Sequence, residues 1–133
     1  MLRPRRTIPR SRAHEIMLAL NPHVLADSEN GWEVFIEDVT DPDGRMYRLE
    51  YRCKRSGQSA RAHCVYNPWP AAPLALTDSH LMPDRSICTS EQTHRGGDDL
   101  EYTVARARFW CTGYSFLREH GIAETRLVLG SDW

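Results

Sequence analysis

The sequence predicts an α+β fold in which helices cover one face of a small antiparallel sheet. Three observations lead to this prediction. Apolar residues recur at helical spacing near the start of the chain and again near its end, and the segments between them alternate between apolar and polar residues. The length of 133 residues suits a single domain, and the contents of 41% apolar and 26% charged residues are ordinary for a globular protein.

A short helix is expected to begin after Ser11, whose side chain can cap its first turn. The proline of Asn21-Pro22 would end it, because proline disfavours helical geometry in the residue before it. Its apolar residues are Ala13, Ile16, Met17 and Leu20. Residues 1–10 are predicted to be a basic flexible arm, outside a single domain at residues 11–133.

Three strands are expected next. The first alternates over residues 32–39, with Trp32, Val34 and Ile36 on one face and Glu33 and Glu37 on the other. The turn signal at residues 41–44 (DPDG) leads to a strand at 47–53, and Ser56-Gly57 leads to another at 60–66. Because short polar turns join these strands, we expect an antiparallel meander with one face toward water.

A long loop and a long helix complete the predicted fold. Residues 67–99 carry four prolines and little periodicity beyond a candidate short strand at 74–76. A loop of this length in a small domain usually carries function. Asp98 and Glu101 predict a capping box for the helix, and Gly121 suits its end. The apolar stripe of this helix comprises Leu100, Val104, Ala107, Cys111, Tyr114 and Leu117.

The 17 basic and 18 acidic residues are unevenly spread along the chain. Residues 1–12 hold five arginines and no acid, which leaves a net charge of −6 on the rest when the whole chain is −1. A basic arm can bind nucleic acid through phosphates, but a solvated terminus is the simpler interpretation. No apolar run approaches the roughly 18 residues that span a bilayer. No hydrophobic segment follows the basic start either, so we expect a soluble, cytoplasmic protein without membrane partners.

The four cysteines differ in their predicted surroundings. None belongs to a C-x-x-C pair, so the strongest zinc and dithiol signatures are absent and reduced thiols are expected. Cys53, Cys64 and Cys111 fall on apolar faces, where cysteine behaves as a small hydrophobic residue. Cys88 lies in the long loop with no apolar pattern around it, which makes it the candidate functional thiol.

Two histidines flank Cys88 in the sequence and leave two kinds of site open. His80, Cys88 and His94 could hold a metal ion, although their spacing matches no zinc pattern. Alternatively, a histidine could act as the base for a cysteine nucleophile in a hydrolase, although no third orienting residue can be identified.

Two segments resemble the ubiquitin-conjugating enzymes. Residues 66–73 (YNPWPAAP) are similar to the proline-rich turn that follows the third strand of that family. The segment from His80 to Ile87-Cys88 resembles the family's active-site segment, in which a His-Pro-Asn triplet precedes an Ile/Val-Cys pair. The bacterial ubiquitin-conjugating-like proteins are more similar still, because a histidine, a Pro-Asp pair and an aliphatic-Cys pair recur among them as in residues 80–88. The resemblance covers about residues 11–121, in the family's element order.

This resemblance implies a ubiquitin-conjugating-enzyme-like α+β fold with an N-terminal helix, an antiparallel meander, a long active-site loop and a long C-terminal helix. It also implies a cysteine acyltransferase that needs no cofactor. Cys88 would accept a ubiquitin-like modifier from an adenylating activating enzyme as a thioester and pass it to a target protein. For the bacterial relatives it further implies antiviral defence and a deconjugating protease encoded in the same operon.

The roles of the residues around Cys88 follow from the same resemblance. His80 matches a histidine that shapes the active-site loop, and the family's asparagine has no counterpart after it. In its place, N–H groups of the loop backbone, Ser90 or His94 could stabilise the oxyanion. Asp84 or His94 could position or deprotonate the attacking amine. Two other functions stay open: a catalytically idle module of the same fold that binds a ubiquitin-like protein, and a small nucleic-acid-binding protein that uses its basic arm.

Overall fold

A computed structural model describes residues 10–88 and 98–133 of the chain. The predicted basic arm, except for Arg10, lies outside the described residues. Ser90 and His94 also lie outside them.

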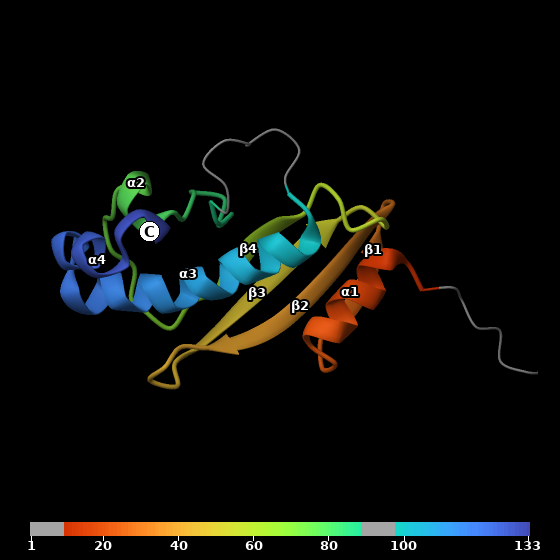
Figure 1. The fold of residues 1–133 in the computed structure, drawn as a ribbon, viewed down its shortest axis with the longest axis horizontal. Coiled ribbons are helices and arrows are strands. Elements are labelled where there is room, and N and C mark those ends of the chain that lie inside the picture. Colours follow the sequence, from red (N-terminus) through yellow and green to blue (C-terminus); the bar gives the residue numbers. More distant parts are fainter. Residues whose placement is uncertain (1–9, 89–97) are drawn as a thin grey trace, which may run out of the picture.

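Within the described residues, the elements follow the order helix, four strands, short helix, long helix and short helix (Figure 1). They are α1 (Arg12–Leu20), β1 (Leu25–Glu29), β2 (Trp32–Thr40), β3 (Met46–Cys53), β4 (Arg61–Tyr66), α2 (Leu76–Ser79), α3 (Leu100–His120), α4 (Ile122–Leu129) and the 3₁₀ helix η1 (Gly130–Asp132). The strands pair antiparallel in the order β1-β2-β3-β4, so the predicted α+β class is confirmed. None of the described helices is long and apolar enough to cross a bilayer.

Strand β1 was not among the three predicted strands. All five of its residues are exposed, so neither face needs apolar residues. Its sequence, LADSE, accordingly lacks the apolar and polar alternation that predicts a half-buried strand. It pairs with β2 through a turn at Asn30 and Gly31, where φ is 52° and 83°. Positive φ at both central residues is typical of the tight hairpin turn that Asn-Gly favours. Asn30-Gly31 was therefore the feature of the sequence from which this hairpin could have been predicted.

Helices α1 and α3 cover one face of the sheet, and the core lies between the two layers. The predicted apolar stripe of α3 is confirmed, because all six of its residues are buried. The predicted strand at 47–53 forms within β3, with Tyr47, Leu49, Tyr51 and Cys53 buried on one face. Ser11 caps α1 as predicted, accepting a hydrogen bond from the His14 amide at 3.2 Å. Figure 1 shows α3 crossing the sheet, with α1 toward one end and α2 and α4 together at the other.

Strand β2 turns its glutamates, not its tryptophan, toward the helices. Trp32 is 39% exposed, whereas Glu37 is 3% exposed and lies beside the fully buried Phe35. The reason is that each buried carboxylate finds partners across the core. Glu33 lies 3.1 Å from Nε2 of His14. Glu37 accepts hydrogen bonds from Arg108, Tyr51 and Asn21.

Two predictions for the later half of the chain, a helix cap and a short strand, are wrong. Asp99, not Asp98, caps α3, accepting from the Tyr102 amide at 2.8 Å. The backbone of Asp98 pairs instead with Ala60, so the helix begins one residue later. The candidate strand at 74–76 does not form, because Ala75 and Leu76 begin the one-turn helix α2.

Candidate functional site

The four cysteines sort as the sequence predicts. Cys53, Cys64 and Cys111 are buried, and burial raises the pKa of Cys53 and of Cys64 to about 11. Burial raises the pKa of the Cys111 thiol still further. Cys88 is half-buried and lies after β4, outside the core. A thiol must ionise and meet its substrate to act as a nucleophile, so Cys88 is the cysteine around which a site could be built.

Cys88 follows a small hairpin that is docked along the outer edge of β4. Within the hairpin, Leu81 bridges Ile87 and the Met82 amide donates to the Ser86 carbonyl at 2.9 Å. The Cys64 amide of β4 donates to the Arg85 carbonyl at 2.9 Å, and the Ile87 amide donates to the Ala62 carbonyl at 2.9 Å. The hairpin therefore extends the sheet and carries Cys88 from the edge of β4 toward α3.

The two ends of this hairpin meet at the candidate site. The Cys88 amide donates to the His80 carbonyl at 2.9 Å. His80 ends α2 in the left-handed conformation, with φ 54° and ψ 21°. A non-glycine residue in this region is uncommon and persists only where its surroundings hold it. The conformation of His80 thus fixes the direction in which the chain leaves α2 and reaches Cys88.

Two tryptophans from other elements hold the end of α2. The indole N–H of Trp110 on α3 donates to the Ser79 carbonyl at 2.8 Å, and that of Trp133 donates to the Asp78 carbonyl at 2.7 Å. The last carbonyls of a helix have no partner within it, so these contacts serve as its cap. The Trp133 ring also meets the His80 ring edge-on, with centroids 4.9 Å apart.

A glycine in α3 makes room for Trp133. A Cβ atom at Gly113 would lie 2.3 Å from Cζ3 of the Trp133 ring, which is closer than any real contact allows. The packing of Trp133 beside α2 therefore depends on a position in the middle of α3 that carries no side chain.

Cys88 lines a cavity of about 20 Å³ between the hairpin, α3 and the segment after α4. Nη2 of Arg106 reaches across this region to the Asp132 carbonyl at 3.0 Å. The residues that line the cavity are His80, Cys88, Arg106, Phe109, Trp110, Asp132 and Trp133.

The structure brings together only part of the predicted site. Cys88 and His80 share the cavity, whereas Asp84 is not among its lining residues. The Asp84 carboxylate instead accepts from the Ser86 hydroxyl at 2.6 Å and from the Ser86 amide at 2.9 Å, and these hydrogen bonds lower its pKa. Ser90 and His94 lie outside the described residues, and with them the candidate metal site that includes His94. In the part of the chain that is described, no three His, Cys, Asp or Glu side chains gather as metal ligands.

Sequence reasoning missed the residues that complete the cavity from α3 and the last residues of the chain. Arg106 and Phe109 lie off the apolar stripe of α3, so helical periodicity gives no reason to select them. Trp133 is 45 residues from Cys88 in the numbering, and no local pattern links the two. The folded arrangement of α3 and α4 alone brings them to the thiol.

A buried hydrogen-bond network fixes the proline-rich segment that precedes α2. The Ser115 hydroxyl on α3 donates to the Asp41 carboxylate at 2.6 Å. It also accepts from the Trp69 indole at 3.1 Å and lies 2.6 Å from the Tyr47 hydroxyl. Although burial opposes ionisation, the hydrogen bonds that Asp41 accepts from Ser115, Arg45 and Asp43 lower its pKa. The network ties the β2–β3 turn, α3 and Trp69 together.

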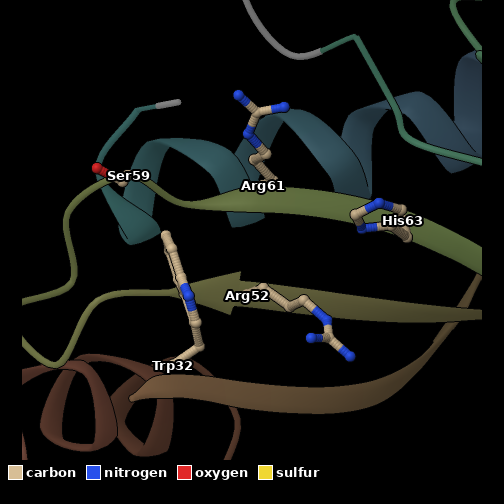
Figure 2. A pocket seen from close by; sticks show the side chains of 5 residues that line it. All are labelled: Trp32, Arg52, Ser59, Arg61 and His63. Atoms are coloured by element: carbon tan, nitrogen blue, oxygen red, sulfur yellow. The ribbon is translucent and has the colours of Figure 1, made fainter. Parts of the chain in front are cut away.

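A second hollow, of about 330 Å³, lies on the sheet face opposite the helices (Figure 2). Side chains from three strands and one loop line it: Trp32, Arg52, Ser59, Arg61 and His63. Nε of Arg52 donates to the Glu50 carboxylate at 2.9 Å, and its Nη2 donates to the Glu29 carboxylate at 3.1 Å. The positive charge of Arg52 is therefore already paired with two carboxylates. Among the described residues, no cysteine lines this hollow, and none of its lining residues also lines the Cys88 cavity.

Comparison with protein-family models, curated proteins and solved structures finds no match to this chain.

Proposed function

We propose that this protein is a ubiquitin-like modifier conjugating enzyme that carries the modifier as a thioester on Cys88. The observation that carries the proposal is the position of Cys88: it is the cysteine outside the core, at the end of a hairpin held by β4 on one side and by α2 on the other. The order of helix, meander, cysteine-bearing loop and long helix is the order that the sequence resemblance implies, and it supports the same proposal.

The proposed cycle has two acyl transfers. The Cys88 thiolate attacks the carbonyl carbon of the thioester that links the modifier to its adenylating activating enzyme. A C–S bond forms to Cys88, the C–S bond to the activating enzyme breaks, and the released thiolate takes a proton. An amine of the target protein then attacks the new thioester, an amide bond forms, Cys88 leaves as thiolate, and the amine gives up a proton.

The proposal gives each residue near Cys88 a distinct role. His80 holds the loop through its left-handed backbone and its carbonyl, so it is a positioning residue. Asp84 stabilises the turn of the hairpin through Ser86. Ser90 and His94, for which the sequence suggests oxyanion or amine contacts, lie outside the described residues. No cofactor takes part in this chemistry.

The proposed setting is the cytoplasm of a bacterium, in a conjugation system that acts against phage. Its partners would be a ubiquitin-like modifier, an adenylating enzyme, a target protein and a deconjugating protease from the same operon. We do not assign nucleic acid as a partner, because the charge of the chain beyond the basic arm is negative.

A catalytically idle binding module is the second candidate. It is favoured by the small size of the cavity beside Cys88, about 20 Å³, which leaves little room around the thiol. In that case a ubiquitin-like protein would bind the same fold without a covalent bond. The test below separates the two candidates.

The test is the reaction of the protein with a modifier and an activating enzyme encoded beside it. The wild type should form an adduct that reducing agent removes, because a thioester exchanges with thiols. Cys88→Ser should form an adduct that resists reductant, since an oxyester exchanges slowly, and Cys88→Ala should form neither. Cys111→Ala serves as the matched control, because that thiol is buried in the core. A reductant-sensitive adduct on Cys88→Ala would disprove the assignment, and binding without any adduct would favour the idle module.

A further inference from the structure

The size of the cavity beside Cys88 limits what can occupy it. Its volume of about 20 Å³ is close to the space that one water molecule needs. A site for a small-molecule ligand or cofactor is usually at least about 300 Å³. The cavity is therefore matched to a single oxygen-sized group attached to something that lies outside it, as the carbonyl oxygen of an acyl group on Cys88 would be.

Three N–H donors of the described residues around this cavity are already engaged in hydrogen bonds. The indole N–H groups of Trp110 and Trp133 donate to carbonyls of α2, and the Cys88 amide donates to the His80 carbonyl. These groups cannot also serve a new acceptor without losing their present partners. They hold the walls of the cavity in place.

Arg106 differs from these residues. Its Nη2 donates to the Asp132 carbonyl at 3.0 Å, and its guanidinium lies over the Phe109 ring at 5.2 Å from the centroid. Its Nε is shielded from solvent and meets no hydrogen-bond acceptor among the described residues. A shielded N–H without an acceptor is costly and rare in folded proteins, so it needs an explanation. Arg106 also lines the cavity that holds Cys88.

We infer that Arg106 is the oxyanion donor of the Cys88 site, with its Nε–H directed to the acyl oxygen that enters the cavity. This inference rests on the proposed function, since it concerns acyl transfer at Cys88. Arg106 would take the place of the asparagine that the resembling family has after its histidine, which this sequence lacks after His80. The positive charge of the guanidinium adds to the hydrogen bond as negative charge develops on the oxygen.

The step is the same for any thioester donor. The Cys88 thiolate adds to the carbonyl carbon, and the electron pair of the C=O bond moves onto the oxygen, which becomes the oxyanion opposite Arg106. The electron pair on the oxygen then re-forms the C=O bond, the donor's C–S bond breaks, and the donor thiolate leaves with the electron pair of that C–S bond. The acyl group is then bound to Cys88, and no oxidant or reductant is needed.

The experiment compares two reactions of the same thiol. Phenyl thioacetate acetylates Cys88 through an oxyanion, whereas iodoacetamide alkylates it by direct displacement and forms none. Any change in the thiolate fraction of Cys88, or in the access of reagents to it, alters both rates together. The ratio of the two rates therefore reports only the stabilisation of the oxyanion. Both are measured by intact mass on the full chain, with peptide mapping to Cys88.

We expect Arg106→Met to slow acetylation by about 10²-fold, the usual effect of removing one oxyanion donor, and to leave alkylation within about threefold. Arg106→Lys keeps the positive charge without the Nε donor, so its acetylation rate should lie between those of the wild type and Arg106→Met. This variant also keeps the test valid if Arg106→Met does not fold. Arg118→Met is the matched control, because Arg118 lies on the same helix beside Trp69 and Tyr114 and does not line the cavity. It should change neither rate.

Equal slowing of both reactions, or no slowing of either, would overturn the inference. The outcome is independent of the conjugation assay. If acetylation depends on Arg106 while no modifier is loaded, the oxyanion site stands and the conjugating function fails. If Arg106→Met loads a modifier at the wild-type rate, the function stands and the role of Arg106 is wrong.

Discussion

At the scale of single residues, the four thiols occupy two kinds of environment. Three lie in the core, where removing the thiolate from water raises their pKa. Cys88 directly follows the docked hairpin and lies next to a cavity that Arg106 also lines. The four thiols therefore differ because their surroundings differ, and we expect a thiol reagent to modify Cys88 in preference to the three buried cysteines.

Brief labelling of the folded protein with iodoacetamide at neutral pH should therefore modify Cys88 first. Burial and the raised pKa values of Cys53 and Cys64, both about 11, slow the other thiols. Mass mapping of the labelled peptides is the measurement. In the Cys88→Ala variant, labelling should become slow, and early modification at Cys111 would contradict this account of the site.

His80 provides a second prediction at this scale. Its left-handed backbone costs about 1–2 kcal/mol for most residues, but less for asparagine. His80→Ala should lower both the melting temperature and the loading of Cys88, because the loop loses its backbone geometry and the contact with Trp133. His80→Asn should recover most of the stability and part of the loading. Loss of loading in both variants at unchanged melting temperature would identify His80 as a base.

At the scale of elements, the candidate site depends on contacts between pieces far apart in the chain. The one-turn helix α2 would be unstable alone, because so short a helix gains few hydrogen bonds for the residues it orders. Trp110 from α3 and Trp133 from the last residues of the chain supply the missing partners. The ion pair of Arg126 on α4 with Asp78, at 2.9 Å, adds a surface contact in the same place.

The close packing at Gly113 tests this dependence. Gly113→Ala puts a methyl group where the Trp133 ring lies, so Trp133 must move away from Asp78 and His80. We expect faster amide hydrogen exchange in residues 76–88 and little change in β2 and β3. Alanine usually stabilises an exposed helix by about 1 kcal/mol relative to glycine, so a more stable protein with unchanged exchange would contradict the packing argument.

At the scale of the whole molecule, Glu37 connects the layers. Its carboxylate accepts from Arg108 of α3 at 2.7 Å, from Asn21 after α1 at 3.0 Å and from Tyr51 of β3. Burial alone would raise the pKa of Glu37, but these hydrogen bonds and the charge of Arg108 outweigh it and lower the pKa. A carboxyl group with a lowered folded-state pKa stabilises the fold above its unfolded pKa, and this contribution is lost as the pH falls through the folded value.

The expected result is a melting temperature that falls as the pH drops below about 4.5, the ordinary value for glutamate. Glu37→Gln should lower the free energy of unfolding at pH 7 by about 2 kcal/mol, because charge-assisted hydrogen bonds are lost. It should also make the melting temperature depend less steeply on pH in the acid range. Asp38→Asn is the control, since Asp38 pairs with Arg48 on the exposed face of the same strand. It should change little at pH 7, and an equal effect of both variants would refute the role of Glu37.

The sequence alone determined the elements whose residues carry their own pattern. Strand β3 alternates, the α3 stripe repeats at helical spacing, and Ser11 and Gly121 mark helix ends, so local physics was sufficient. The same patterns placed three cysteines in the core and Cys88 outside it. The resemblance to conjugating enzymes also came from the sequence, and the activity it implies stays a proposal.

Only the tertiary structure decided which face of β2 is buried and what surrounds Cys88. A buried glutamate is stable only with partners, and those of Glu37 lie on α3, 71 residues away for Arg108, and on β3. Likewise, Arg106, Trp110 and Trp133 reach the cavity because α3 packs across the sheet and α4 folds back beside α2. Burial of charge and the shape of a site depend on pairings between distant residues, and local periodicity carries no information about them.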